Sequence, residues 1–369
     1  MMEADLTLLS ILFILAVITS IVCTKLIIIN AARVGLISEP TERCAHVNPT
    51  PNGGGLAFVF SFLSIMSFLY SWNYFSSNIF LSIGFGGFLI ALIGFFDDYL
   101  RLSVKLRLIT QALIITATLF VFSPLPPIEL FGFELKSPWI LWISITLLLV
   151  WWLNLFNFMD GIDGLATLES ICILLSATLL IGLHAILSNE GILILLLLAS
   201  LLGFLVFNWA PAKIFMGDAG STFLGYVLGM IALLTIINGS LNLWTWLILS
   251  GVFWVDATTT LLRRMSQGER WYQAHQSHTY QRVSRWLESI DGTDRGRIMA
   301  HRKVTLLILL INVCWLFPLA GSTLMWPTCG IFLLGLAWTP LLFLAFYFGA
   351  GTQEELVERA VKQEVSREN

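Results

Sequence analysis

The sequence predicts an all-α integral membrane protein that crosses the bilayer about eleven times. Of its 369 residues, 57% are hydrophobic and only 12% are charged, and the mean hydropathy is +0.85. This composition excludes a soluble globular domain. Several apolar runs reach roughly 18 residues, the length of a spanning helix, whereas the strands of a membrane barrel would give alternating segments of about 10 residues. Helices are therefore expected throughout.

Eleven apolar segments, separated by polar breaks, are expected to form the spanning helices of one undivided domain over residues 1–369. The first is expected to remain as a span, because residues 1–5 lack the basic start and the small-residue cleavage site of a signal peptide. The segments cover residues 6–29, 54–70, 80–96, 108–122, 138–155, 165–184, 191–207, 222–238, 241–262, 304–320 and 326–349.

Basic residues are concentrated in every second loop, which together hold 18 of the 20 Lys and Arg residues. Because the cytoplasmic loops of membrane proteins carry the excess of Lys and Arg, we expect the N-terminus outside and the C-terminus in the cytoplasm. No nucleic-acid partner is expected. The cytoplasmic set comprises loops 30–53, 97–107, 156–164 and 208–221, the basic loop 263–303 and the polar tail 350–369.

One run of polar residues closes an apolar segment and opens the next. A carboxylate in hydrocarbon costs roughly 3 kcal/mol on insertion scales, so these side chains are expected to face a polar site or solvent. If the run is helical, Asp160 and Asp163 share a face, and the glycine after each of them leaves room for a ligand. The side chains concerned are Asn154, Asn157, Asp160 and Asp163.

Adjacent aspartates, Asp97 and Asp98, end the third apolar segment. Two neighbouring carboxylates repel each other unless a cation or a basic partner is present, so the pair suggests phosphate or metal chemistry. The alternative is a solvated helix end. Lys105 and Arg107 follow in the same loop, and Gln111 would face the same site if the next helix begins near residue 106.

Asp218 lies between two glycines at the expected start of the eighth span, shortly after Lys213. A carboxylate in this position can hold a hard cation while the backbone amides and the helix dipole face a phosphate. The alternative is that Asp218 or Ser221 is an ordinary helix N-cap.

The loop 263–303 carries nine basic and four acidic residues and contains His275 and His278. Zinc is disfavoured, because no nearby Cys or third His completes a tetrahedral set. Beyond the histidines, apolar side chains recur at helical spacing beside two arginines, which predicts a helix lying on the anionic inner leaflet. His301 has no companion in the sequence. The residues of the predicted helix are Tyr280, Arg282, Val283, Arg285, Trp286 and Leu287.

These motifs, in this order on an eleven-span chain, resemble the polyprenyl-phosphate N-acetylhexosamine-1-phosphate transferases, a superfamily that includes the translocase acting on UDP-MurNAc-pentapeptide. Residues 269–281 are similar to the branch that initiates O-antigen or exopolysaccharide synthesis, since the three consecutive histidines typical of the translocase are absent. One departure is Asn52, where a larger or basic residue is expected before the glycines 53–55. The first loop's share in binding is therefore open.

The resemblance implies roles for particular residues. Asp218 would ligate Mg²⁺, with Mn²⁺ as a substitute, and Asp97 and Asp98 would serve the attacking lipid phosphate. The nucleotide sugar and its phosphates would contact a larger set: Asn154, Asn157, Asp160, Asp163, Lys105, Arg107, Lys213, His275, His278 and Arg282.

The implied reaction joins a UDP-N-acetylhexosamine to undecaprenyl phosphate and releases UMP, at the cytoplasmic face of a bacterial inner membrane. A phosphate monoester is mostly dianionic at pH 7, which favours direct attack by the lipid phosphate over a covalent aspartyl-phosphate intermediate. The resemblance is compatible with a homodimer and leaves the hexosamine open. The rival class is a secondary transporter, but transporter acids tend to lie near the bilayer midplane, and these acids are expected at helix ends.

Overall fold

The computed structural model describes residues 2–38, 49–122, 125, 128–130, 133–135, 137–182, 185–269, 275–291 and 293–352. Residues 39–48 of the first predicted loop and the tail beyond Thr352 lie outside this part of the chain. In chain order the main helices are α1 (Met2–Val34), α2 (Gly55–Ser71), α3 (Ser77–Ile79), α4 (Gly86–Leu100), α5 (Val104–Val121), α6 (Pro138–Phe158), α7 (Leu165–Ile181), α8 (Asn189–Asn208), α9 (Gly217–Ile237), α10 (Leu243–Leu249), α11 (Gly251–Ser266), α12 (Thr279–Asp291), α13 (Asp294–Ile311), α14 (Phe317–Met325) and α15 (Gly330–Tyr347).

Short irregular helices and strands complete the architecture. The π-helices η1 (Phe80–Phe85) and η3 (Asn312–Leu316) join α3 to α4 and α13 to α14, and the 3₁₀ turn η4 (Pro327–Cys329) precedes α15. Two antiparallel strand pairs form in loops: β1 (Ile37–Ser38) with β2 (Thr50–Pro51), and β3 (Ile128–Leu130) with β4 (Phe133–Leu135). The fold is otherwise helical across the described residues.

The class of polytopic membrane protein is confirmed. In the described part of the chain, eight helical segments are long and apolar enough to cross a membrane, or nine if one bent pair counts as a span. Two shorter apolar helices, α2 and α7, correspond to the second and sixth expected segments. The number of crossings and their orientation stay predictions.

The structure corrects the ninth expected span. Residues 241–262 were expected to form one continuous helix, whereas α10 and α11 meet at Ser250 with an angle of 75° between them. The indole of Trp338 from α15 donates a hydrogen bond of 3.2 Å to the Leu247 carbonyl next to the break. Backbone that leaves helical geometry at membrane depth is tolerated where the protein supplies its partners.

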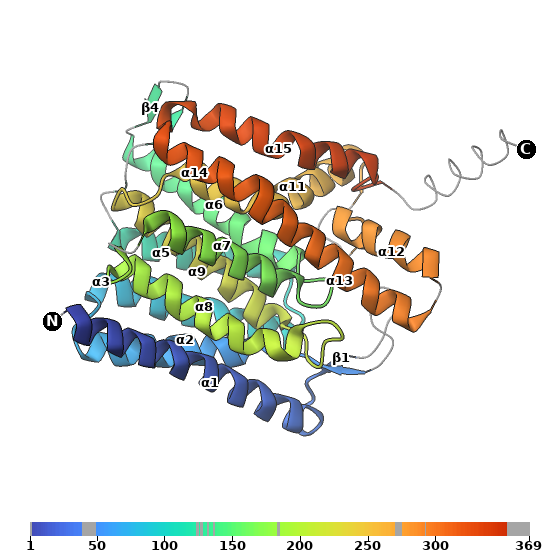
Figure 1. Ribbon diagram of the computed structural model, residues 1–369, viewed down its shortest axis with the longest axis horizontal. Coiled ribbons are helices and arrows are strands. Elements are labelled where there is room, and N and C mark those ends of the chain that lie inside the picture. Colours follow the sequence, from blue (N-terminus) through green and yellow to red (C-terminus); the bar gives the residue numbers. More distant parts are fainter. Residues whose placement is uncertain are drawn as a thin grey trace, which may run out of the picture.

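Helix α9 lies at the centre of a bundle of roughly parallel and antiparallel helices (Figure 1), and 89% of its most apolar stretch is buried. Glycines let α2 and α4 approach its first turn. A Cβ atom at Gly55 would lie 2.3 Å from the Gly220 Cα atom, and one at Gly94 would lie 2.5 Å from the Asp218 carbonyl oxygen. Larger side chains at these positions would separate the helices, so the glycines determine how closely the ends of three helices meet.

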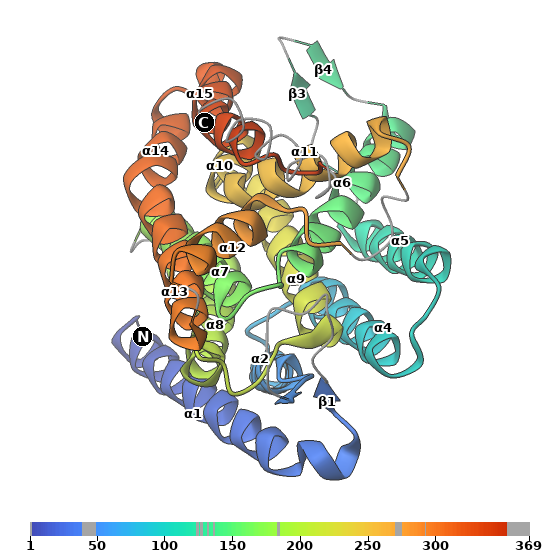
Figure 2. The ribbon, with the colours of Figure 1, turned by 90° about the vertical axis from the view of Figure 1, so that its right-hand side faces the viewer.

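The helix predicted after the histidines exists, and its location on the leaflet stays a prediction. Helix α12 packs alongside α13 (Figures 1 and 2). Tyr280 is buried, and Val283 and Leu287 pack against the core, while Trp286 is 55% exposed. One part of its apolar side therefore packs against protein, while Trp286 and Ile290 stay exposed.

Candidate active site

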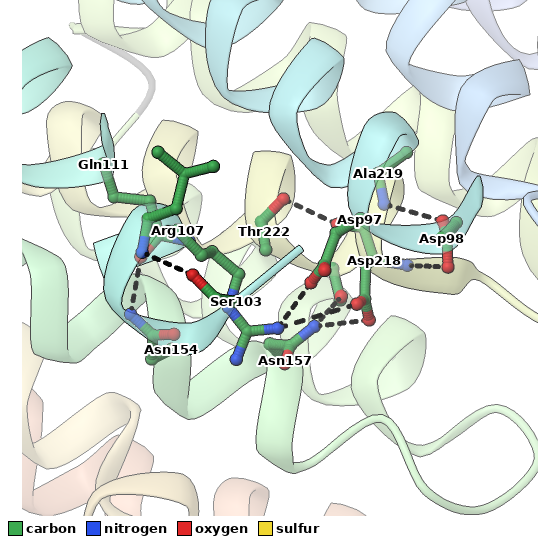
Figure 3. A network of polar contacts seen from close by, with 12 residues as sticks. Asp97, Asp98, Ser103, Arg107, Gln111, Asn154, Asn157, Asp218, Ala219 and Thr222 are labelled. Atoms are coloured by element: carbon green, nitrogen blue, oxygen red, sulfur yellow. Dashed lines mark hydrogen bonds and ion pairs between the residues drawn. The ribbon is translucent and has the colours of Figure 1, made fainter. Parts of the chain in front are cut away.

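The adjacent aspartates at the end of α4 have different environments. Asp98 accepts hydrogen bonds from the backbone N–H groups of Asp218, at 3.1 Å, and Ala219, at 3.2 Å (Figure 3). It therefore caps the N-terminus of α9 from a neighbouring helix, where four backbone donors lack helical partners. Neither Asp218 nor Ser221 makes the local cap considered from the sequence. Gly217 has φ +76°, and a Cβ atom there would lie 2.9 Å from Asp98 Oδ2.

Asp97 is buried and pairs with a basic partner, as the adjacent carboxylates suggested. Its Oδ2 atom lies 2.5 Å from Nη1 of Arg107, and the same nitrogen lies 3.8 Å from Asp218 Oδ2. Ser103 caps α5, accepting a hydrogen bond from the Leu106 N–H group, and so fixes the turn from which Arg107 projects. The guanidinium thus stands between carboxylates of α4 and α9.

The two asparagines at the end of α6 face the same cluster. Asn157 donates to Asp218 Oδ1 at 2.8 Å and lies 3.0 Å from the Ser221 hydroxyl. Asn154 donates to the Gln111 side-chain oxygen at 2.9 Å, so Gln111 does face this site. Four helices, α4, α5, α6 and α9, therefore contribute side chains to one polar cluster at one end of the bundle (Figure 3).

Residues 159–164 form a turn between α6 and α7, so the helical face expected for Asp160 and Asp163 does not exist. Burial, together with the negative charges of Asp218, Asp98 and Asp163, raises the pKa of Asp160 to about 7. Asp163 instead accepts a hydrogen bond of 3.0 Å from the Ala212 N–H group and lies 3.5 Å from His301 Nδ1. Asp160 thus belongs to the acidic cluster, while Asp163 joins two loops.

The histidine pair is close, although both residues lie before α12, which begins only at Thr279. The rings of His275 and His278 lie 4.9 Å apart. Burial, then the neighbouring His278 and Arg264, lower the pKa of His275 to about 3. Tyr280 donates a hydrogen bond of 3.2 Å to the Phe158 carbonyl, which brings this segment against the turn after α6.

The remaining predicted residues lie at the edge of the cluster or apart from it. Lys105 and Lys213 are exposed. Arg282 is buried and donates to the Thr352 carbonyl, so it fastens α12 to the chain after α15. Asn52 donates to Asp98 Oδ1 at 3.5 Å, which places the first loop's glycine segment beside the cluster after all.

Three further residues of possible functional importance lie outside the motifs that the sequence marks. Asp256 and Glu169 are buried acids inside apolar segments, and that rarity is a signal that could have marked them. Asp256 accepts backbone hydrogen bonds at the start of α12, and Glu169 accepts a 2.5 Å hydrogen bond from Asn312. His301 has no companion in the sequence, whereas in the structure it lies between Asp163 and Glu288.

The acidic cluster can hold a divalent cation that takes some of its ligands from the substrate. Among the described residues, no three His, Cys, Asp or Glu side chains form a ready-made metal site. Mg²⁺ usually keeps several waters and binds one or two carboxylates together with substrate phosphates. Asp218, whose side chain is 35% exposed, suits that mode. The donor set therefore fits Mg²⁺ that arrives with a diphosphate.

Comparison with known proteins supports a single family. A model described as glycosyl transferase family 4 matches residues 80–236. The chain is 32% identical over 291 residues to a probable undecaprenyl-phosphate N-acetylglucosaminyl 1-phosphate transferase of Bacillus subtilis, covering 73% of this chain and 76% of that protein. It is 32% identical over 238 residues to a phospho-N-acetylmuramoyl-pentapeptide-transferase of Lactococcus lactis, covering 61% and 70%. A protein of the same name from Streptococcus gordonii is 34% identical over 247 residues, covering 62% and 73%.

The helical membrane fold, with carboxylates, amides and a guanidinium gathered at one end, defines a membrane-embedded phosphosugar transferase. The chain belongs to glycosyl transferase family 4, the superfamily of polyprenyl-phosphate N-acetylhexosamine-1-phosphate transferases.

Proposed function

We propose that this protein transfers N-acetylhexosamine-1-phosphate from a UDP-sugar to undecaprenyl phosphate and releases UMP. The observation that carries the proposal is the cluster in which Arg107 stands between Asp97 and Asp218 while Asn157 holds Asp218. Phosphoryl transfer depends mainly on positioning and on neutralising charge, and these side chains are suited to both tasks.

The two aspartates of α4 are assigned different tasks. Both carboxylate oxygens of Asp98 accept backbone hydrogen bonds from α9, so Asp98 holds the first turn of α9 and with it Asp218. Asp97 orients Arg107, whose guanidinium can bind the attacking lipid phosphate with two parallel N–H donors. The lipid phosphate attacks the β-phosphorus of the UDP-sugar directly, and the bond to the UMP oxygen breaks.

Charge neutralisation at the diphosphate is divided among several groups. Mg²⁺, when bound through Asp218, would stabilise negative charge on the departing UMP. His278, and His275 as a neutral imidazole, donate hydrogen bonds to phosphate oxygens from the segment that contacts the turn after α6. Asp160 lies on the same turn and binds the nucleotide-sugar side.

The finer assignments follow the motif order. We place the active site at the cytoplasmic face of a bacterial inner membrane, as the distribution of basic residues predicts. The segment from His275 to His278 lacks three consecutive histidines, which supports a role in initiating O-antigen or a related polysaccharide. The names of the Lactococcus and Streptococcus relatives favour a second candidate function, the synthesis of the lipid-linked precursor of the cell wall.

A substrate panel tests the proposal. Purified protein would be incubated with undecaprenyl phosphate, Mg²⁺ and UDP-GlcNAc, UDP-GalNAc, UDP-FucNAc, UDP-QuiNAc or UDP-MurNAc-pentapeptide, and UMP and lipid-linked sugar would be measured together. We expect equal amounts of both products from one N-acetylhexosamine donor. The proposal is wrong if no donor releases UMP in a lipid-dependent reaction. Uptake of UDP-sugar into proteoliposomes without UMP release would instead support a transporter.

A further inference from the structure

Asp256 is a buried acid of α11 that organises the segment carrying the two histidines. Its Oδ1 atom accepts the backbone N–H of Thr279 at 2.8 Å, and its Oδ2 atom accepts that of Tyr280 at 3.1 Å. The hydroxyl of Thr260, one turn further along α11, also donates to Oδ1 at 3.1 Å. Asp256 thus caps the N-terminus of α12 from a neighbouring helix, and its negative charge faces the positive end of the helix dipole.

The same carboxylate faces one nitrogen of His278. Nδ1 of His278 lies 3.4 Å from Asp256 Oδ1, within the range of an ion pair. The Tyr280 ring stacks on the imidazole, with ring centres 5.8 Å apart and planes inclined by 21°, and the His275 ring lies 4.9 Å away. The buried imidazole thus contacts a carboxylate and two aromatic rings, which leaves it little freedom to rotate.

This arrangement determines what the other ring nitrogen can do. A hydrogen on Nδ1 directed at a carboxylate fixes the orientation of an imidazole and leaves Nε2 for a second partner. The carboxylate also compensates the positive charge when both nitrogens carry hydrogens. A histidine held in this way can donate from Nε2 to a phosphate oxygen while Nδ1 remains directed at Asp256.

We infer that Asp256 is a positioning residue for the transfer reaction, which acts by holding His278 so that its Nε2 atom faces the substrate diphosphate. The inference rests on the proposed function for the identity of the ligand. The competing explanation is that Asp256 only caps α12 and supports the fold. The two explanations differ in whether the effect of Asp256 depends on His278.

A double-mutant cycle separates them. The enzyme, its Asp256→Asn and His278→Gln variants, and the double variant would be assayed for kcat/KM with the UDP-sugar. We expect Asp256→Asn to lower kcat/KM about tenfold in the wild-type background and less than about twofold in the His278→Gln background. Equal losses in both backgrounds would overturn the inference, as would a His278→Gln variant with normal turnover.

Two further variants show whether a loss of activity comes from a loss of folding. Asp256→Glu keeps a carboxylate for the helix cap, and it replaces Asp256→Asn in the cycle if the latter does not fold. Ser188→Ala removes an ordinary cap, that of α8, where the Ser188 hydroxyl accepts from the Gly191 N–H group. As a matched control it should lower the thermal midpoint without changing kcat/KM.

A readout without turnover distinguishes failure of this inference from failure of the proposed function. ¹⁵N spectra of histidine-labelled protein in lipid would report which nitrogen of His278 carries hydrogen, with the His278→Gln variant giving the assignment. We expect Nδ1 to be protonated in the wild type and the Nδ1 signal to shift in Asp256→Asn. An unprotonated Nδ1, or identical spectra in the two proteins, would overturn the positioning role even if the enzyme transfers sugar normally. Absence of transfer by the wild type would refute only the proposed function.

Discussion

Asn157 donates a hydrogen bond of 2.8 Å to Asp218 and thereby joins the last turn of α6 to the first turn of α9. Replacing Asn157 by Leu should release the carboxylate of Asp218 and lower kcat/KM by about tenfold or more, because a charge-assisted hydrogen bond contributes about 1.5–3 kcal/mol. Steady-state assays with the UDP-sugar would measure this. The matched control is Ser221→Ala, which removes the other contact of Asn157 and the hydrogen bond that Ser221 donates to the Gly217 carbonyl within the same turn, and leaves the bond to Asp218 in place. Equal losses in both variants would contradict a role through Asp218.

The two adjacent aspartates should respond differently to the same substitution. Asp98→Asn leaves one carbonyl oxygen for two backbone donors, so it should destabilise the protein by about 1 kcal/mol as well as lower activity. Asp97→Asn should lower activity with a smaller change in stability, because it weakens the ion pair with Arg107. Thermal unfolding in detergent, measured beside turnover, gives both quantities. A larger loss of stability in Asp97→Asn would reverse the assignment.

Metal dependence should be absolute. Asp218→Asn is expected to lose nearly all turnover, because a charged ligand of a cation that would also bind the diphosphate serves both positioning and charge neutralisation. Wild-type protein should be inactive in excess EDTA and recover with Mg²⁺ or Mn²⁺. Full activity in excess EDTA would refute the metal assignment at Asp218.

His275 should make the protein less stable in acid. Its pKa is lowered to about 3 in the folded state, against about 6.5 when unfolded, so between these values the unfolded chain binds a proton that the folded protein does not. Stability therefore falls as the pH drops below about 6.5. The thermal midpoint should decrease more between about pH 7.5 and about pH 5 in the wild type than in His275→Gln. Identical decreases in the two proteins would rule out this contribution.

The predicted orientation can be tested by labelling single cysteines in intact cells, in a background without the native cysteines. Two exposed serines are suited to this test. The predicted topology places Ser71, at the end of α2, outside the cell and Ser266, at the end of α11, in the cytoplasm. A membrane-impermeant thiol reagent should modify Ser71→Cys and leave Ser266→Cys unmodified until the cells are opened. The reverse pattern would place the acidic cluster outside the cell.

The sequence was sufficient to predict the class of fold and much of the cluster. Hydropathy locates the ends of the helices, and polar residues at helix ends on the same side of the membrane are expected to lie near one another. Asp97, Arg107, Asn157 and Asp218 could be grouped in this way. Contacts between elements could not be predicted in this way. Asp98 caps a helix 120 positions further along the chain, and nothing local marks that pairing.

The break in the ninth segment illustrates the same limit. The bend falls at Ser250 and Gly251, and the partner of the Leu247 carbonyl beside it is Trp338 from a distant helix. The position of His301 depends likewise on the fold, since α13 brings it beside Asp163. The expected helical face of Asp160 and Asp163 was wrong because two glycines, Gly161 and Gly164, lie where a helix would have to continue.

The 75° bend between α10 and α11 also restricts how the last third of the chain can diverge in evolution. A Cβ atom at Gly251 would lie 2.9 Å from the Trp338 indole nitrogen, and that nitrogen bonds the carbonyl of Leu247 at the break. A larger residue at 251 would displace the indole and leave the carbonyl without a donor. Positions 251 and 338 should therefore covary among homologous sequences, with a small residue at one wherever a tryptophan occupies the other.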